Sequence, residues 1–135
     1  MLKGGKKMLL KTIITLEREA ADRIVKNIKR AANGSKDKPV AIAVIGAALS
    51  AHGHILTLDT PPGAFFFLGE EAKVKAQCAI DCHPIENPDL EGVLIKNDGQ
   101  ILGAIGVSGR TPEKNRNLAL AGKKYIEQLI SNQVF

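Results

Sequence analysis

Two apolar segments on either side of a turn sequence constrain the fold more than any other feature of the chain. Val93–Ile95 and Ile101–Val107 flank the tripeptide Asn97-Asp98-Gly99. Asn, Asp and Gly tolerate the positive φ angles of tight hairpin turns, so this region predicts two antiparallel strands joined by a short turn. Gly103 and Gly106 in the second segment indicate either a bulge or the close approach of another part of the backbone.

A second strand pair is predicted upstream. Val40–Ile45 and Gly53–Leu58 are short apolar segments bounded by glycine, proline or polar residues, which favours strands. Their proximity suggests a hairpin with an unusually long connection. Asp59–Gly63 contains two prolines and a glycine. Such a segment cannot continue a strand ladder, so we expect a loop there.

Three helices complete the pattern. Apolar residues recur every four positions from Leu16 to Ile28, which predicts an amphipathic helix over 15–33 that ends at Asn33-Gly34. Alanines recur on one face of a second predicted helix, over 64–80, where small side chains would let another backbone approach closely. Thr111-Pro112-Glu113 combines a capping residue, a proline and an acid, as is typical of a helix start.

The expected order of elements is therefore α-β-β-α-β-β-α. Because both strand pairs are predicted hairpins, we expect an α+β fold with a largely antiparallel sheet and helices packed on it. The chain has 135 residues, which is the size of one domain. We expect a flexible basic leader over residues 1–14, followed by a single domain over residues 15–135.

The formal net charge of +5 is concentrated near the N-terminus, since residues 1–38 hold eleven Lys or Arg against four acids. The aromatic cluster Phe65–Phe67 lies in the slightly acidic remainder, so the basic and stacking groups that nucleic-acid binding needs are separated. Apolar stretches fall well short of the roughly 20 residues of a spanning helix, and no export signal is recognisable. We therefore expect no nucleic acid, no membrane and a cytoplasmic location.

The most distinctive candidate site is the segment where the last predicted strand leads into the last predicted helix. It contains Gly106, Ser108, Gly109, Arg110 and Thr111. Free backbone N–H groups, two hydroxyls, a guanidinium and the positive end of a helix would together suit an anion. The alternative is that the glycines simply permit a tight turn between a strand and a helix.

The histidines and cysteines form no recognisable metal site. His52 and His54 are two residues apart, and Cys78, Cys82 and His83 lie close together. No second pair follows at a suitable spacing, so no metal is predicted. A single His remains chemically suitable as an axial ligand of haem. The patterns of serine, cysteine and metal hydrolases are absent, so a binding protein is favoured over an enzyme, with catalysis left open.

Several segments resemble the GlcG/HbpS-like family, which also provides the C-terminal domain of PduO-type proteins. The run Asp98–Glu113, with Ala119 and Gly122 in the helix that follows, resembles the C-terminal signature of the family. Ala72–Ala79 resembles its A-x-x-K-A-x-T-A helix, and Asp59–Gly63 resembles its D-G-A-P loop. The chain departs from the family pattern at Cys78, Arg110 and Asn115. It also lacks the usual Asp after the first strand, has extra residues between Ile45 and Gly53, and is shorter from Ile80 to Leu90.

The resemblance implies an α-β-α fold around an antiparallel sheet, assembly into homo-oligomers and, in some members, haem binding. PduO-type relatives are connected with cobalamin-dependent diol metabolism. We therefore expect an oligomeric small-molecule-binding protein, with haem or a corrinoid as the candidate ligand, that is accessory to a metabolic operon such as diol or glycolate utilisation. The residues expected to bind the ligand are Gly106, Ser108, Gly109, Arg110, Thr111, His54 and Asp59.

Two other functions remain open at this point. The chain could be an enzyme of small-molecule metabolism with no recognisable catalytic pattern. It could also be a structural assembly protein that uses Phe65–Phe67 in subunit contacts, because aromatic residues are enriched at interfaces. The alternative for these rings is that they belong to the core of the domain.

Overall fold

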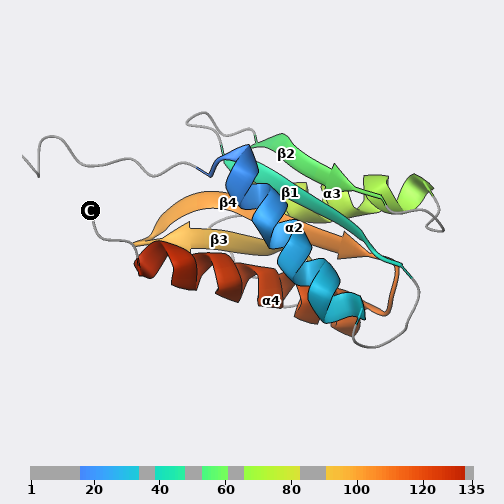
Figure 1. The fold of residues 1–135 in the computed structure, drawn as a ribbon. Helices are drawn as coiled ribbons and strands as arrows, with labels where there is room; N and C mark the ends of the chain where they lie inside the picture. The colour runs from blue at the N-terminus through green and yellow to red at the C-terminus, as the bar shows by residue number, and fades with distance from the viewer. Residues whose placement is uncertain (1–15, 34–38, 48–52, 61–65, 83–90, 133–135) are drawn as a thin grey trace, which may run out of the picture.

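The computed structural model describes residues 16–33, 39–47, 53–60, 66–82 and 91–132. Within these ranges the elements follow one another in the predicted order (Figure 1). They are α2 (Arg18–Asn33), β1 (Ala41–Ala47), β2 (Gly53–Asp59), α3 (Phe66–Asp81), β3 (Val93–Asn97), β4 (Gln100–Ser108) and α4 (Pro112–Ser131). The basic leader, His52, His83, Phe65 and residues 61–63 of the predicted loop lie outside the described residues.

The four strands form one antiparallel sheet in the order β2-β1-β4-β3. Both predicted hairpins are present, and β1 joins them by pairing with β4. The turn between β3 and β4 has positive φ at Asp98 (49°) and Gly99 (80°), as expected for a tight hairpin. The α+β class and the antiparallel sheet predicted from the sequence are confirmed.

Helices α2 and α4 cover one face of the sheet, and α3 covers the other (Figure 1). The first face is packed with large branched side chains, because α2 and α4 present an apolar stripe toward the strands. The fully buried residues of this layer include Ile24, Ile28, Ile42, Ile105 and Ile126. Apolar burial on this scale is the main source of stability for a domain of this size.

The layer between the sheet and α3 is built from small residues instead. Ala72 and Ala76 of α3 are fully buried against Ala41, Ala43 and Ala104 of the strands. Small side chains on both surfaces allow the helix backbone to lie directly on the sheet. The close approach predicted from the alanine spacing is therefore observed.

None of the helices in the described part of the chain combines the length and apolar content needed to cross a bilayer. The cytoplasmic location and the division into a leader and one domain stay predictions.

Candidate functional site

The predicted anion-binding segment lies at the end of β4, where a sharp turn leads into α4. Gly109 adopts a φ of 126°, and a Cβ there would lie 2.8 Å from the carbonyl oxygen of Pro39. Thr111 caps α4, because its hydroxyl accepts a hydrogen bond from the N–H of Lys114 at 3.2 Å. Both residues therefore have a local structural role that requires no ligand.

Arg110 connects this turn to the end of α2. Its guanidinium donates a hydrogen bond to the carbonyl oxygen of Ala32 at 3.2 Å. The last carbonyls of a helix have no partner within the helix and carry partial negative charge, so a cation is favourable there. The backbone N–H of Arg110 donates to Oδ1 of Asn115 at 3.0 Å. Within one chain, Arg110 thus holds the turn against two helices.

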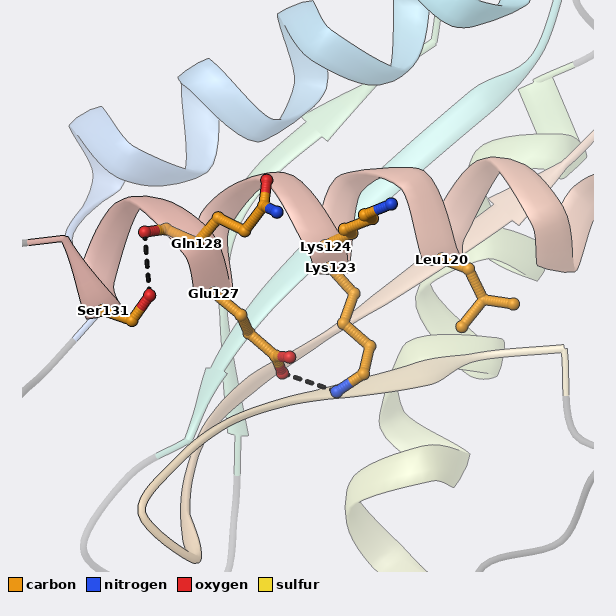
Figure 2. A pocket seen from close by; sticks show the side chains of 6 residues that line it. All are labelled: Leu120, Lys123, Lys124, Glu127, Gln128 and Ser131. Atoms are coloured by element: carbon orange, nitrogen blue, oxygen red, sulfur yellow. Dashed lines mark hydrogen bonds and ion pairs between the residues drawn. The ribbon is translucent and has the colours of Figure 1, made fainter.

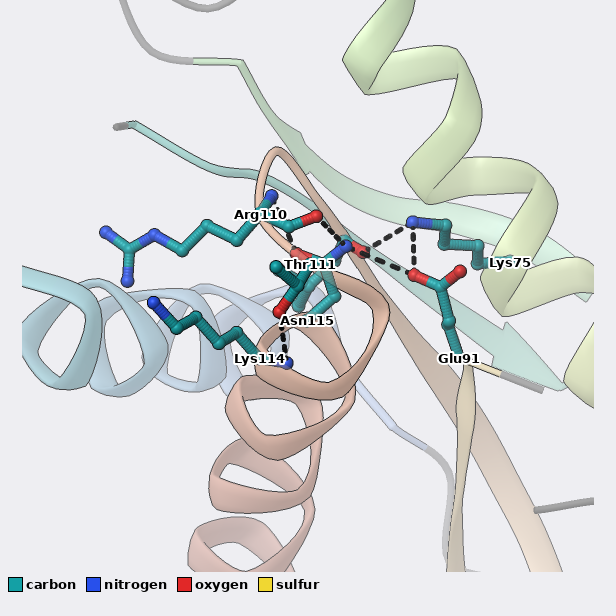
Figure 3. Close-up of polar contacts among 7 residues, drawn as sticks. Lys75, Glu91, Arg110, Thr111, Lys114 and Asn115 are labelled. Atoms are coloured by element: carbon teal, nitrogen blue, oxygen red, sulfur yellow. Dashed lines mark hydrogen bonds and ion pairs between the residues drawn. The ribbon is translucent and has the colours of Figure 1, made fainter. Parts of the chain in front are cut away.

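Three side chains form a partly buried polar cluster beside the turn, which we call the Lys75 cluster; it consists of Lys75, Glu91 and Asn115 (Figure 3). The ammonium of Lys75 lies 2.6 Å from Oε1 of Glu91 and donates to the carbonyl oxygen of Val107 at 3.1 Å. The amide of Asn115 donates to the same Glu91 oxygen at 3.1 Å and to the carbonyl oxygen of Arg110 at 3.0 Å.

The cluster keeps Glu91 ionised. Burial alone would raise the pKa of this carboxyl, but hydrogen bonds from Lys75 and Asn115, together with the charge of Lys75, outweigh it and leave the pKa below its ordinary value of 4.5. Asn115 is only 2% exposed, so its three hydrogen bonds are made away from water. The cluster joins α3, the start of β3, the end of β4 and the first turn of α4.

Ser108 is a completely buried site residue whose polar atom has no hydrogen-bond partner. The residue is 0% exposed, and its Oγ has no hydrogen-bond partner. Since side chains alternate along a strand, Ser108 shares its sheet face with Gly106, which lies against α3. A buried hydroxyl without a partner costs roughly 1–3 kcal/mol. A bound molecule that supplies a hydrogen bond would recover part of that cost.

Asp59 lies at the same end of the sheet. In the centre of the sheet Ile42 pairs with Asp59 on one side and with Val107 on the other. Oδ1 of Asp59 lies 3.4 Å from the ammonium of Lys29, while Oδ2 is buried without a hydrogen-bond partner. Because Ile42 belongs to the core under α2 and α4, Asp59 faces those helices, whereas Ser108 faces α3. We refer to Asp59 and Ser108–Thr111 together as the sheet end.

His54 is not part of the sheet end. Its backbone pairs with Gly46, which pairs with Gly103 near the other end of the sheet. His54 and Asp59 are five residues apart on β2, which corresponds to about 17 Å along an extended strand. The predicted site residues therefore separate into one group at the sheet end and His54 at the opposite end.

The sequence patterns did not single out Glu91 and Asn115 as site residues. Glu91 precedes β3 in a segment with no recognisable pattern. Asn115 is four residues beyond the cap Thr111, a spacing that places it on the inner side of the first turn of the helix. Lys75 belongs to the segment Ala72–Ala79 that resembles the family.

The two cysteines and Phe67 differ in how far their side chains are buried. Cys78 is partly buried and Cys82 is exposed, and both are free thiols. Cys78 belongs to α3, the helix packed on the sheet, but its side chain is only partly buried. The ring of Phe67 is exposed, so this phenylalanine does not belong to the core of a single chain.

Comparisons with known proteins find similarity at the level of the fold. No family model matches the sequence. No curated protein matches it either.

Solved structures do match. Protein ORFY of Klebsiella pneumoniae, described under the family model DUF336, is 18% identical with a TM-score of 0.70, covering 92% of this chain and 94% of its own. A double mutant of HbpS from Streptomyces reticuli is 20% identical with a TM-score of 0.67, and the match covers 93% of this chain and 94% of the HbpS chain. PduOC in complex with haem is 16% identical with a TM-score of 0.66, and the match covers 82% of this chain and 94% of the PduOC chain. The chain therefore has the fold of the GlcG/HbpS-like proteins, the fold that the resemblance in its sequence predicted.

Proposed function

We propose that the chain is a small-molecule-binding protein of the GlcG/HbpS-like family whose ligand presents an anionic group to the sheet end. The observation that carries the proposal is the Oγ of Ser108, which is completely buried and has no hydrogen-bond partner. Native proteins rarely leave such a group unsatisfied, and the exceptions often mark functional positions. The similarity to the fold of PduOC in its complex with haem is consistent with this role.

The charges around the sheet end favour an anion. Lys29 and Lys75 each face one carboxylate, Asp59 and Glu91 respectively. The guanidinium of Arg110 faces a backbone carbonyl. The N-terminus of α4, which carries partial positive charge, begins at Pro112. The N-terminus of α4 would attract a carboxylate or phosphate, although the first turn of the helix also carries the carboxylate of Glu113.

The sheet end fits the carboxylate side of a haem better than the iron. Arg110 and the hydroxyls of Ser108 and Thr111 are suitable partners for a carboxylate. His54, the histidine within the described residues, lies about 17 Å along β2 from Asp59. The backbone of His54 therefore lies at the opposite end of β2 from Asp59. Haem supplies redox and ligand-binding chemistry when bound. A cobalamin would instead present neutral carboxamides and a single anionic phosphodiester.

Absorbance titration of the purified protein with hemin, and separately with hydroxocobalamin, tests this function. We expect a saturable shift of the absorption band with one of the two compounds. Arg110→Ala and Ser108→Ala should each weaken binding about tenfold, equivalent to roughly 1.4 kcal/mol. Lys26→Ala removes an exposed cation from α2 and should leave binding unchanged.

Two results would contradict the proposal. The absence of a saturable shift with either compound would remove both ligand classes. Equal affinity in wild type, Arg110→Ala and Ser108→Ala, with folding verified by circular dichroism, would show that the ligand binds away from the sheet end. His54→Ala tests the iron ligand separately, because it should alter the spectrum of bound haem without changing the affinity for hydroxocobalamin.

We also propose that a second copy of the chain covers the outer surface around α3. Four large apolar side chains are exposed there, Ile55 (49%) and Leu58 (40%) on β2 and Phe67 (49%) and Val74 (58%) on α3. Outer strands of a four-stranded sheet are about 14 Å apart, whereas one helix is about 10 Å wide, so α3 alone leaves part of this face uncovered. Exposed apolar patches of this kind mark association surfaces.

Light scattering after size-exclusion chromatography tests the assembly. Val74→Glu should reduce the mass of the particle toward that of one chain, because a carboxylate would be buried in the contact. Leu120→Glu, at an exposed leucine on α4, is the matched control and should keep the mass of the wild type. If both variants fold and keep the same mass, the contact does not include α3.

A further inference from the structure

A second group of charged side chains lies away from the sheet end, on the side of α4 that faces β3 (Figure 2). Lys123 and Glu127 are one helical turn apart and form an ion pair. They line a groove of about 460 Å³ together with four further residues of α4. Nothing in the proposed function uses this pair.

Both side chains also bind the backbone of β3. The ammonium of Lys123 donates to the carbonyl oxygen of Leu94 at 2.9 Å. The carboxylate of Glu127 accepts from the N–H of Lys96 at 2.9 Å through Oε2, the same oxygen that faces Lys123. A carbonyl, an ammonium, a carboxylate and an amide thus form one continuous chain of hydrogen bonds.

The bonded groups of β3 are those that a neighbouring strand would use. β3 is at the edge of the sheet, with β4 on its other side. In a parallel ladder, one residue of the added strand makes two hydrogen bonds to its neighbour. Its N–H donates to the carbonyl of one residue there, and its carbonyl accepts from the N–H of the residue two positions further along that neighbouring strand. Leu94 and Lys96 are related in this way, so Lys123 and Glu127 occupy the places of one residue of a fifth strand.

We propose that the Lys123–Glu127 pair closes the edge at β3 and prevents other strands from adding to the sheet there. An exposed edge strand is a template for association, and proteins often place charged side chains against it. Here the two charged side chains also form hydrogen bonds with the outward-facing carbonyl and N–H of β3, so another strand cannot use these groups. Both side chains are only 29% exposed, so water competes weakly for these bonds.

The experiment measures amide hydrogen exchange at Lys96 and the particle mass in the same variants. In Lys123→Met/Glu127→Leu, the side chains keep similar size but lose every polar atom. We expect exchange at Lys96 to accelerate about tenfold or more, as for the loss of a hydrogen bond worth about 1.4 kcal/mol. We also expect particles larger than those of the wild type, at concentrations where the wild-type mass is constant.

Two comparisons separate this effect from a general loss of charge. Lys124→Met/Gln128→Leu alters a neighbouring pair at the same spacing on an exposed part of α4, and both readouts should match the wild type. The single variant Glu127→Gln keeps an acceptor for the N–H of Lys96, so exchange there should stay slow, whereas it should be fast in Glu127→Leu.

The proposal is overturned if the folded double variant exchanges Lys96 at the wild-type rate. It is also overturned if exchange accelerates while the mass stays that of the wild type, because the edge would then be open without attracting another strand. If the double variant does not fold, Glu127→Leu and Lys123→Met are measured singly against the same two criteria.

Discussion

Gly106 of β4 lies directly against the backbone of α3 at Ala72. A Cβ on Gly106 would be 2.0 Å from the carbonyl oxygen of Ala72 and 2.8 Å from the backbone nitrogen of Ala76. This contact sets the distance between the helix and the sheet, and with it the positions of Lys75 and Ser108. The glycine is required by close packing rather than by an unusual φ angle.

Gly106→Ala should therefore destabilise the protein strongly. The added methyl group meets backbone atoms, which cannot rotate away as a side chain would, so α3 must move. We expect a loss of about 3 kcal/mol in the free energy of unfolding, measured by urea denaturation. Gly99→Asn is the control, since nothing lies within 4 Å of its Cβ position and its φ is 80°; Asn tolerates that angle. Equal stabilities of the two variants would argue against the close contact.

Glu91 should make stability depend on pH in the acidic range. Its pKa is lowered in the folded protein from 4.5, so the unfolded chain binds the proton more readily. The contribution of Glu91 is complete above about pH 4.5 and is lost as the pH falls through the folded value. In Glu91→Gln this part of the decline should disappear, whereas Glu71→Gln, on the exposed side of α3, should follow the wild type. Urea denaturation from pH 7 to pH 3 compares the three proteins.

Asn115→Asp should lower the free energy of unfolding far more than its small change in size suggests. The amide donates to Glu91 and to the carbonyl of Arg110, and a carboxylate would place an acceptor against both. We expect a loss of about 3 kcal/mol at pH 7. The loss should shrink at lower pH, because a protonated carboxyl can donate one of these bonds again.

Asn117→Asp provides the comparison for this prediction. Asn117 is exposed in the first turns of the same helix, where a negative charge is mildly favourable. Thermal unfolding at pH 7 and pH 4 should therefore show a marked pH effect for Asn115→Asp and almost none for Asn117→Asp. Similar behaviour of the two variants would mean that the amide donors of Asn115 contribute little.

Ser108→Ala should stabilise the protein without ligand. The substitution removes a buried hydroxyl that has no partner and leaves a methyl group in an apolar layer, so we expect a gain of about 1 kcal/mol. Ser131→Ala removes a hydroxyl that donates to the carbonyl of Gln128 and should give no gain. A loss of stability in Ser108→Ala would show that the hydroxyl is already hydrogen-bonded in solution.

The order and approximate bounds of the helices and strands could be predicted because their signals are local. The turn at Asp98 and Gly99 requires positive φ, and Thr111 caps the helix that follows it. Both properties depend on neighbouring residues alone. The proximity of the predicted strand segments in the chain likewise predicted which strands pair as hairpins. The predicted bounds of the helices differ from the observed ones by only a few residues, because the end of a helix depends on its last hydrogen bonds.

The sequence by itself determined the order of the elements, the antiparallel class and the hairpin turn at Asp98 and Gly99. Only the tertiary structure decided what the site residues face. Arg110 binds the end of α2, Glu91 meets Lys75, and Asp59 meets Lys29. Each relationship joins elements that are distant in the chain. It depends on how helices pack on the sheet, and that packing follows from many buried contacts at once, which no short segment of sequence contains.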